Sequence, residues 1–458
     1  MKKQALSLLL ALCLLLALVP VSASAAETVD SGTCGDNLTW TLDSDGLLTI
    51  RGTGAMADYQ NSQDPVTEKF RTTAPWGTHY QDIKALVVED GVTFIGDNAF
   101  YGCSSLTDVT LPDSVTSLSS HAFANCTALT EITLPKDLTA IGASAFVGCS
   151  ALKKIALPQG ITTLERYTFY RCASLADVTL PEGLQFIGYS AFQECVSLTE
   201  LALPESLTSI GECAFEGCTA LADVALPANL TTLEWSAFRD CPSLTGIVLP
   251  EGLTLVEGYA FSGCSSLTDM VIPDKVKTLE DSAFENCTSL GSITLPAGVT
   301  TIEEFVFDGC TALRDVFFQG TPEQKAAIAI AKRNEPLQNA RWHCQTPFTD
   351  VPAGAYFEKP VAWAVANAIT VGTTDATFSP LENCTRGQVI TFLWRAAGCQ
   401  EPQSTENPFT DVQENSFCYK AILWAVEQGI TTGVTETTFA PDEPCLRGQA
   451  VTFLWRAA

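Results

Sequence analysis

The sequence has little positive charge and very little histidine. Its 458 residues include 25 Lys and Arg against 52 Asp and Glu, which gives a net charge of −27. Such an acidic chain repels phosphate backbones and anionic lipid surfaces, so we expect no nucleic-acid partner. Only three His residues are present, too few for most zinc sites and Ser-His-Asp triads.

Sequence motifs of catalysis are also lacking. We find no G-x-S-x-G, no H-E-x-x-H and no phosphate-binding loop in the sequence, and these are the signatures of hydrolases, metalloproteases and nucleotide-binding enzymes. We therefore predict that the protein is not an enzyme, and that it has no catalytic residues, no cofactor and no metal site.

A long apolar run occurs once, at the start of the chain. Lys2 and Lys3 precede an apolar stretch over residues 5–19, Pro20 ends it, and residues 23–25 have the form Ala-Ser-Ala. The run is short for a membrane span, and the order of features is that of an export signal. We predict that residues 1–26 are a signal peptide, that no membrane span follows, and that the protein is secreted.

The rest of the sequence is dominated by a repeat of 23 residues. Leu recurs with this period in an L-x-x-L-x-L setting, which is typical of a leucine-rich repeat solenoid. We predict a mainly β solenoid of ten repeats over residues 86–316. Two further series share the period, and we call them the phenylalanine ladder and the cysteine ladder. They are Phe100, Phe123, Phe146, Phe169, Phe192, Phe215, Phe238, Phe261, Phe284 and Phe307, and Cys103, Cys126, Cys149, Cys172, Cys195, Cys218, Cys241, Cys264, Cys287 and Cys310.

The cysteine ladder has two interpretations. It could bind metal or carry redox chemistry, or it could be a column of small buried side chains, since free Cys is among the most buried residue types. Equivalent positions in a solenoid lie about 4.8 Å apart, whereas a disulfide brings Cβ atoms to about 3.8 Å. The spacing therefore favours buried free thiols.

A solenoid also needs a cap at each end. Residues 27–85 contain alternating apolar residues on both sides of Asp45 and Gly46, which predicts a β-hairpin and an N-terminal β cap. At the other end we predict a C-terminal cap over residues 317–346. It would have a helix over residues 322–331 that begins after Thr321, and a last strand over residues 340–343.

These features resemble a known family of bacterial surface proteins. The segments at residues 32–40, 52–56 and 74–76, and the repeat form Leu-Pro-x-x-Leu-Thr-x-Ile-Gly-x-x-Ala-Phe-x-x-Cys at residues 134–149, are similar to those of BspA-like leucine-rich repeat proteins. The resemblance covers about residues 32–345. It implies a cell-surface protein of an anaerobic or host-associated bacterium that binds proteins or matrix.

A second duplication, with its own fixed step, follows the solenoid. Phe-Thr-Asp-Val at residues 348–351 returns at 409–412, and Thr-Phe-Leu-Trp-Arg-Ala-Ala at 391–397 returns at 452–458. We predict two modules, residues 347–398 and 409–458, each with a helix, a loop and a second helix. Residues 399–408 would form a polar linker.

The two modules resemble S-layer homology (SLH) modules. The resemblance implies non-covalent attachment to a pyruvylated secondary cell-wall polysaccharide and a position on the bacterial wall. Arg386 and Arg447 match the family's binding position, where a guanidinium can hold a carboxylate with two hydrogen bonds. Thr385 and Gln388 could instead serve only as a helix capping box. The residues predicted to bind the polysaccharide are Asp350, Trp363, Thr385, Arg386, Gln388, Asp411, Trp424, Arg447 and Gln449.

A column of acidic residues is the candidate ligand face of the solenoid. It occupies the position two residues after each repeated Leu, which points outward from the strand. The column could keep the strands soluble, or it could bind a basic partner or divalent cations. The protein would then be an adhesin-like binding protein, the alternative being a structural component of the wall or S-layer. Its charged members, the acidic column hereafter, are Asp108, Glu131, Lys154, Asp177, Glu200, Asp223, Asp269 and Asp315.

Overall fold

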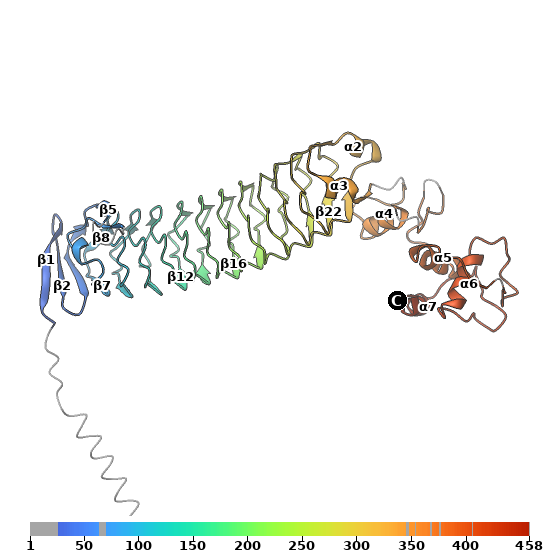
Figure 1. Cartoon of the computed structure of the whole chain (residues 1–458), viewed down its shortest axis with the longest axis horizontal. Coiled ribbons are helices and arrows are strands. Elements are labelled where there is room, and N and C mark those ends of the chain that lie inside the picture. The colour runs from blue at the N-terminus through green and yellow to red at the C-terminus, as the bar shows by residue number, and fades with distance from the viewer. Residues whose placement is uncertain are drawn as a thin grey trace, which may run out of the picture. The chain divides into compact units, whose positions relative to one another are not determined.

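The protein forms two compact units, residues 1–227 and 228–458. Both contain turns of a β-solenoid, and the second also carries the C-terminal helices (Figure 1). This computed structural model describes residues 26–63, 70–344, 348–352, 354–366, 369–374, 377–404 and 406–457. The predicted signal peptide lies outside the described residues, except for its last residue. Within the described ranges, no helix is both long and apolar enough to cross a membrane.

The first unit opens with a sheet that covers the edge of the solenoid. Strands β1 (Thr28–Gly35), β2 (Leu38–Asp43) and β3 (Leu47–Gly52) are antiparallel, and β3 then pairs in parallel with β7 (Ala85–Val88) and β7 with β9 (Asp108–Thr110). The predicted hairpin at Asp45 is therefore confirmed as β2 and β3. Because β3 pairs with β7, the cap covers this edge of the first parallel strand.

Most turns of the solenoid contribute two short parallel strands, and in the turns that begin at Leu129 and Leu244 isolated bridges take the place of some of them. Lys154 lies opposite Asp177 and Thr163 opposite Phe186, so the register equals the sequence period. The 3₁₀ helix η1 (Gly77–His79) and the antiparallel pair β5 and β6 belong to the cap region. The remaining strands of this unit are β4 (Gly54–Ala55), β5 (Asn61–Gln63), β6 (Phe70–Thr72), β8 (Val92–Ile95), β10 (Ser117–Leu118), β11 (Ala140–Ile141), β12 (Lys154–Ala156), β13 (Thr163–Leu164), β14 (Asp177–Thr179), β15 (Phe186–Ile187), β16 (Glu200–Ala202), β17 (Ser209–Ile210) and β18 (Asp223–Ala225).

The second unit continues the same construction and then becomes helical. Its parallel columns are β20-β22-β24-β26 and β21-β23-β25. Its strands are β19 (Thr232–Leu233), β20 (Asp269–Val271), β21 (Thr278–Leu279), β22 (Ser292–Leu295), β23 (Thr301–Ile302), β24 (Asp315–Phe318), β25 (Ala329–Ile330) and β26 (Arg341–His343). Its helices are α2 (Pro322–Ala326), α3 (Glu335–Asn339), α4 (Glu358–Ala366), α5 (Arg386–Ala396), α6 (Tyr419–Glu427) and α7 (Arg447–Ala457).

The C-terminal cap differs from the prediction at its first helix, and it contains a second helix, α3, that the sequence did not predict. Helix α2 does begin after Thr321, with a complete capping box, but it ends at Ala326 rather than at residue 331. Ala329 and Ile330 form β25 instead and pair with β23. This pairing gives hydrogen-bond partners to the backbone groups of β23, the next strand of the column. Tertiary contact therefore overrides the helix propensity of Ala329 and Ile330. The predicted last strand is confirmed as β26.

The two ladders form the centre of the solenoid. Within each unit, neighbouring phenylalanine rings stack with centroids 5.2 to 5.9 Å apart and planes within 3 to 22° of parallel. Trp76 from the cap stacks on Phe100 at 5.5 Å and so occupies the first place of the ladder. All cysteines of the cysteine ladder are buried and free.

The bends of each repeat use left-handed backbone on both sides of the buried Phe. His121 and Asn125, which flank Phe123, have φ angles of 58° and 57°. Equivalent positions in every repeat also have positive φ, and about half of those after the Phe are Gly. The two residues with left-handed backbone, two positions before and two positions after the Phe, each bend the chain. The Phe between these bends therefore points inward.

The C-terminal helices divide between two clusters. Phe348, Val351 and Val361 form a small core around α4, which lies against β26. Helix α5 instead packs against α6 and α7, where its Ile390 is buried with Phe453. The second helix of the first module is therefore part of the core of the second module, and the two modules interlock.

Candidate functional site

The first turn of α5 carries three of the predicted polysaccharide residues. Thr385 Oγ1 accepts a hydrogen bond from the Gln388 backbone N–H at 3.2 Å, and Gln388 Oε1 accepts one from the Thr385 N–H at 2.8 Å. These contacts form a complete capping box. Both side chains therefore stabilise the start of α5, and their role in binding polysaccharide stays a prediction.

Arg386 has a buried side chain, exposed by only 4%. Its Nε donates to the Phe439 carbonyl at 2.9 Å, and its guanidinium carbon lies 4.8 Å from the centroid of the Phe439 ring and 5.4 Å from that of Phe453. Burial lowers the pKa of this guanidinium, whereas the charge of Asp411 acts in the opposite direction. Arg386 thus reaches from the first module into the second, a contact that sequence reasoning missed.

Arg447, the equivalent residue of the second module, is exposed. Leu446 precedes it in place of Thr, and the Leu446 backbone N–H still donates to Gln449 Oε1 at 3.0 Å. Only half of the capping box is kept, because Leu has no oxygen to accept the other bond. The two arginines therefore have different surroundings despite their equivalent positions.

Asp350 and Asp411 each hold a loop of their own module. The two carboxylate oxygens of Asp350 accept hydrogen bonds from the backbone N–H groups of Phe378 and Ser379, at 2.8 and 2.7 Å. Asp411 makes the equivalent contacts at 2.9 and 2.7 Å. Hydrogen bonding from the Phe378 N–H is the main reason that the pKa of Asp350 is lowered. Both carboxylates thus have a structural partner, and sugar binding by them stays a prediction.

The two predicted tryptophans differ in accessibility. Trp363 on α4 is 40% exposed, whereas Trp424 on α6 is 5% exposed and lies in the core around α6. The indole N–H of Trp424 points to Gln400 Oε1 at 3.5 Å. Of the two, only Trp363 presents a ring to solvent that a sugar could stack on.

A groove of about 400 Å³ lies beside α5 and is lined by residues of the first module and by Phe417 of the second. Thr385 and Gln388 line it, but Arg386 does not. Arg395 contributes the positive charge, and its Nη1 also donates to the Ile369 carbonyl at 3.1 Å. Sequence reasoning missed Arg395, although the signal was present in its recurrence as Arg456, which donates in the same way to the Ile430 carbonyl.

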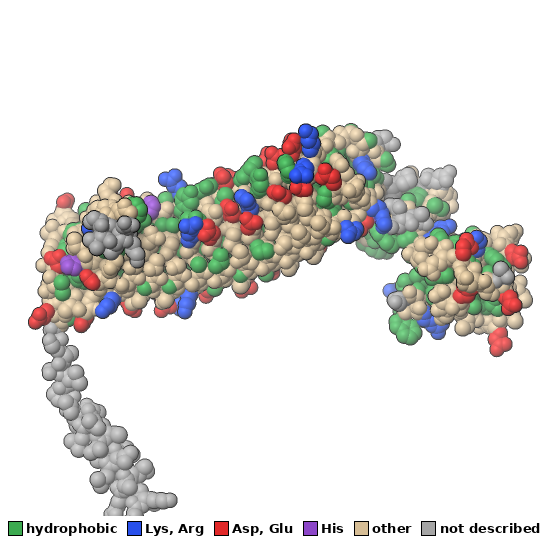
Figure 2. Space-filling model, viewed as in Figure 1, with side chains coloured by type: hydrophobic (Ala, Val, Ile, Leu, Met, Phe, Trp, Pro, Cys, Tyr) green, Lys and Arg blue, Asp and Glu red, His purple; other side chains and the backbone are tan. Residues whose placement is uncertain are grey.

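The acidic column lies on the first strand of its turns, except for Glu131, which forms an isolated bridge to Lys154. Its members up to Asp269 are exposed, and Asp315 is partly buried. Lys154 pairs with Glu131 at 2.8 Å. Asp177, Glu200 and Asp223 follow on successive turns, line a shallow groove of about 490 Å³, and form no ion pair among the described residues. Figure 2 shows acidic side chains along the solenoid surface with fewer basic ones between them.

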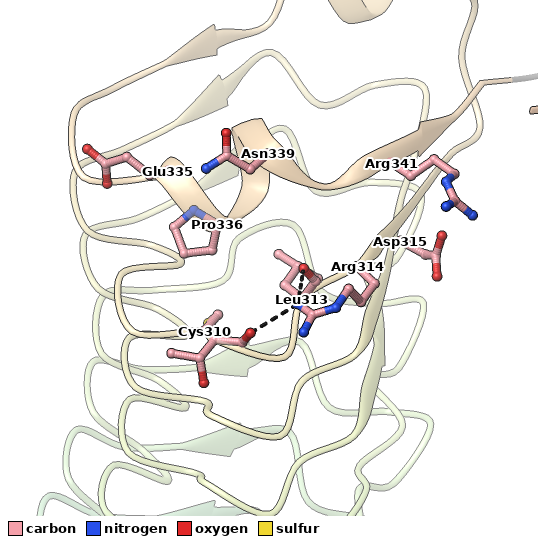
Figure 3. Close-up of a pocket in the computed structure, with 9 residues that line it drawn as sticks. Cys310, Leu313, Arg314, Asp315, Glu335, Pro336, Asn339 and Arg341 are labelled. Carbon is pink, nitrogen blue, oxygen red and sulfur yellow. Dashed lines mark hydrogen bonds between the residues drawn. The ribbon is translucent and has the colours of Figure 1, made fainter.

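The column ends at the C-terminal cap. Arg341 on β26 is the register partner of Asp315 on β24, and His343 Nε2 lies 2.8 Å from Asp315 Oδ1. A cavity of about 720 Å³ beside them is lined by the last repeat, α3 and β26 (Figure 3). Arg314 in this cavity donates to the Thr311 carbonyl at 3.1 Å. Basic groups therefore close the end of the acidic column.

Metal-ligating side chains are dispersed over the described ranges. These ranges hold no group of three or more His, Cys, Asp or Glu side chains placed to share an ion. The cysteine-ladder thiols instead donate to backbone carbonyls, as Cys149 does to Phe123 at 3.1 Å.

Comparison with known proteins identifies both parts of the chain. The profile of the BspA type leucine rich repeat region, in six copies, matches residues 79–199 and 185–314. The S-layer homology domain profile matches residues 347–390 and 408–451. Both families are non-catalytic modules of surface proteins, and S-layer homology domains bind cell-wall polysaccharide.

Two curated proteins and one solved structure are among the relatives. An endoglucanase of Bacillus sp. (strain KSM-635) is 35% identical over 130 residues, 28% of this chain and 13% of that protein. A cell surface protein of Thermoanaerobacter kivui is 34% identical over 116 residues, 24% of this chain and 15% of that protein. The chain thus matches a small part of these relatives. A leucine rich cell surface protein from Faecalibacterium prausnitzii A2-165 is 25% identical, with a TM-score of 0.35 over 66% of this chain and 98% of that chain.

Proposed function

Because the chain belongs to the BspA-type leucine-rich repeat family and is a cell-surface protein attached to the bacterial wall through its S-layer homology domains, we propose that it is a non-catalytic binding protein with two parts. The helical modules attach it to a pyruvylated wall polysaccharide, and the solenoid presents the acidic column to a basic protein or matrix partner. We propose the domain boundaries predicted from the sequence for the two caps, the solenoid, the modules and the linker.

The groove beside α5 is the observation that carries the anchoring proposal. An anionic sugar needs a local cation on a chain whose net charge is −27, and Arg395, in the last turn of α5, supplies one in this groove. A guanidinium pairs with a carboxylate through charge-assisted hydrogen bonds. Thr385 and Gln388 line the same groove and could add hydrogen bonds from their side chains.

Anchoring is tested by sedimenting the secreted protein with purified cell walls. We expect binding to fall when the pyruvyl groups are removed by mild acid. Arg395→Gln should weaken binding about tenfold or more, because it removes a charged partner of the sugar. Arg456→Gln, at the equivalent place in the second module, is the matched control. Binding that survives both depyruvylation and Arg395→Gln would exclude the groove.

The predicted arginines are tested in the same assay. Arg386→Ala should weaken wall binding more than Arg447→Ala, because Arg386 also joins the two modules. Since Arg386→Ala also affects stability, bound protein is normalised to the folded fraction measured by circular dichroism. Equal wall binding by the double variant and the parent would remove both arginines from the proposal.

For the solenoid, the three adjacent unpaired carboxylates carry the proposal. Asp177, Glu200 and Asp223 repel each other across neighbouring turns, by about 1 kcal/mol per pair in water, and a basic partner would relieve this repulsion. Changing all three to Lys should abolish binding of a basic ligand found in a screen against host matrix proteins. A matched control, Glu182→Lys with Glu251→Lys and Asp274→Lys, makes the same charge change at exposed sites off the column.

The alternative is a structural component of the wall or S-layer. S-layer homology domains themselves favour this possibility, because they place the solenoid on the wall whether or not it has a ligand. Electron microscopy of the purified protein separates the two functions. A regular lattice, together with equal ligand binding by the column triple variant and the parent, would favour the structural role and leave the column as a solubility device.

A further inference from the structure

Cys384 and Cys445 occupy equivalent positions in the two helical modules. Each stands two residues before the first residue of a helix, α5 or α7, and they are separated by the same step as the other repeated motifs of the duplication. The segments that hold them run antiparallel, with Thr385 opposite Pro444. The Cys445 N–H donates to the Cys384 carbonyl at 2.9 Å.

This register places the two cysteines directly opposite each other. In an antiparallel pair, the residue before Thr385 faces the residue after Pro444, and these residues are Cys384 and Cys445. Residues joined by such a backbone hydrogen bond have Cα atoms about 5.5 Å apart. Disulfides span Cα separations of about 4.4 to 6.8 Å, so the backbone already lies within the range of a disulfide.

Neither thiol is fully buried. Cys384 is exposed and Cys445 is half-buried. The pKa of the Cys445 thiol is raised mainly by burial, with a further increase from Cys384 and an opposing effect of Arg386.

The ladder cysteines, Cys418 and Cys399 are less suited to pair with either of them. The cysteine-ladder thiols are buried and bonded to carbonyls of the solenoid core. Cys418 is 1% exposed, and its sulfur lies 3.6 Å from Ser416 Oγ. Cys399 follows α5 at its far end, about 16 Å along the helix from Cys384.

We propose that Cys384 and Cys445 form a disulfide that links the two modules covalently. The two thiols give up two protons and two electrons, an Sγ–Sγ bond forms, and the oxidant, itself a disulfide, is reduced to two thiols. Such oxidants act in the compartments that exported proteins enter. The bond fixes the starts of α5 and α7 to each other next to Arg386. This proposal does not depend on what the modules bind.

The test uses the full secreted chain, purified in reduced form and then treated with oxidised glutathione. Free thiols are blocked with iodoacetamide in denaturant, and the protein is cleaved with trypsin and a glutamate-specific protease without reduction. We expect mass spectrometry to find residues 383–386 linked to residues 437–447, because Pro444 protects the bond after Glu443 from cleavage. Cys384→Ser should abolish this linked peptide, whereas Cys399→Ser, the control at another exposed cysteine, should keep it.

The linked protein should also be harder to unfold in its C-terminal modules. We expect oxidation to raise the thermal midpoint of the helical signal, dithiothreitol to reverse the rise, and Cys384→Ser to show no change. Separate glutathione adducts on both cysteines without a cross-link, or a dominant link from Cys384 to Cys399, would overturn the proposal.

Discussion

The thiol of Cys149 donates a hydrogen bond to the backbone carbonyl of Phe123 in the preceding repeat, with 3.1 Å between sulfur and oxygen. The same contact recurs along the cysteine ladder within each unit, at 3.0 to 3.3 Å. A buried carbonyl left without a donor is costly. Cys is small and apolar and still donates a weak hydrogen bond, so it suits a place between tightly stacked turns.

Burial of these thiols predicts a loss of stability at alkaline pH. The pKa of Cys149 is raised to about 12 by desolvation, and burial acts in the same direction on eight other ladder cysteines. An unfolded thiol ionises near pH 8.5. Between about pH 9 and 12 the unfolded state therefore releases protons that the folded state keeps, and the free energy of unfolding falls as pH rises.

Each such thiol contributes a slope of about 1.4 kcal/mol per pH unit once its unfolded form is ionised. We expect the urea midpoint to fall steeply between pH 8.5 and 10.5 and to be unaffected by these thiols below pH 7.5. Cys149→Ala should reduce this slope by about 1.4 kcal/mol per pH unit, the contribution of one proton. The variant thereby separates the effect of the thiols from that of Tyr and Lys, which also ionise at alkaline pH. An unchanged slope in this variant would contradict the explanation.

The phenylalanine ladder predicts a large difference between two nearby residues. Phe192 is fully buried and stacks on Phe169 and Phe215, whereas Phe186 on β15 is 45% exposed. Phe192→Ala should lower the free energy of unfolding by about 3–5 kcal/mol, because it leaves a cavity between stacked turns. Phe186→Ala should change it by less than about 1 kcal/mol. Urea denaturation of both variants measures the difference, and similar losses would contradict a stacked core.

Much of the solenoid could be predicted from sequence because its contacts repeat. A fixed period of 23 residues makes equivalent residues neighbours, so the pairing of Lys154 with Asp177 follows from the period alone. Trp76 could not be found in this way. Its separation from Phe100 does not match the period, and it reaches the ladder from a cap with a different backbone, so no periodic signal marks it.

In the helical modules, sequence predicted the elements but not their packing. The order of α4, α5, α6 and α7 follows from the duplication and the capping signals. The burial of Arg386 against Phe439 depends on how the modules meet, which the equivalent sequences of Arg386 and Arg447 do not encode. The groove residue Arg395 was missed although the sequence does contain a signal for it. Its recurrence in the second module is visible, but nothing in the sequence assigns a role to this arginine.

Asp350 predicts a loss of stability in acid. Its pKa is lowered because its carboxylate accepts two backbone hydrogen bonds, whereas in the unfolded chain it is about 3.9. The stabilisation is therefore present above about pH 4 and is lost as pH falls through the lower, folded value. We expect the Asp350→Asn variant to be less stable than the parent at pH 7. Between pH 5 and 3, its melting temperature should fall by less than that of the parent. Thermal melts at several pH values measure this, and parallel curves would contradict it.

Substitution of Arg386 and of Arg447 by Ala should have very different effects on stability. Arg386→Ala removes the hydrogen bond to the Phe439 carbonyl and the contacts with the Phe439 and Phe453 rings, and it leaves that carbonyl without its donor. An unpaired buried acceptor and lost cation–π contacts together cost about 2–4 kcal/mol. Arg447→Ala removes an exposed side chain and should change stability by less than about 0.5 kcal/mol.

The measurement is urea unfolding of the secreted protein, followed by circular dichroism at helical wavelengths. Arg386→Lys distinguishes charge from shape: a lysine keeps the charge but has no Nε–H aimed at the carbonyl and no flat face for the rings. It should therefore recover little of the loss. Full recovery of stability by Arg386→Lys would mean that charge alone holds the modules together. Equal stability of the Arg386→Ala and Arg447→Ala variants would mean that the two modules do not depend on this contact.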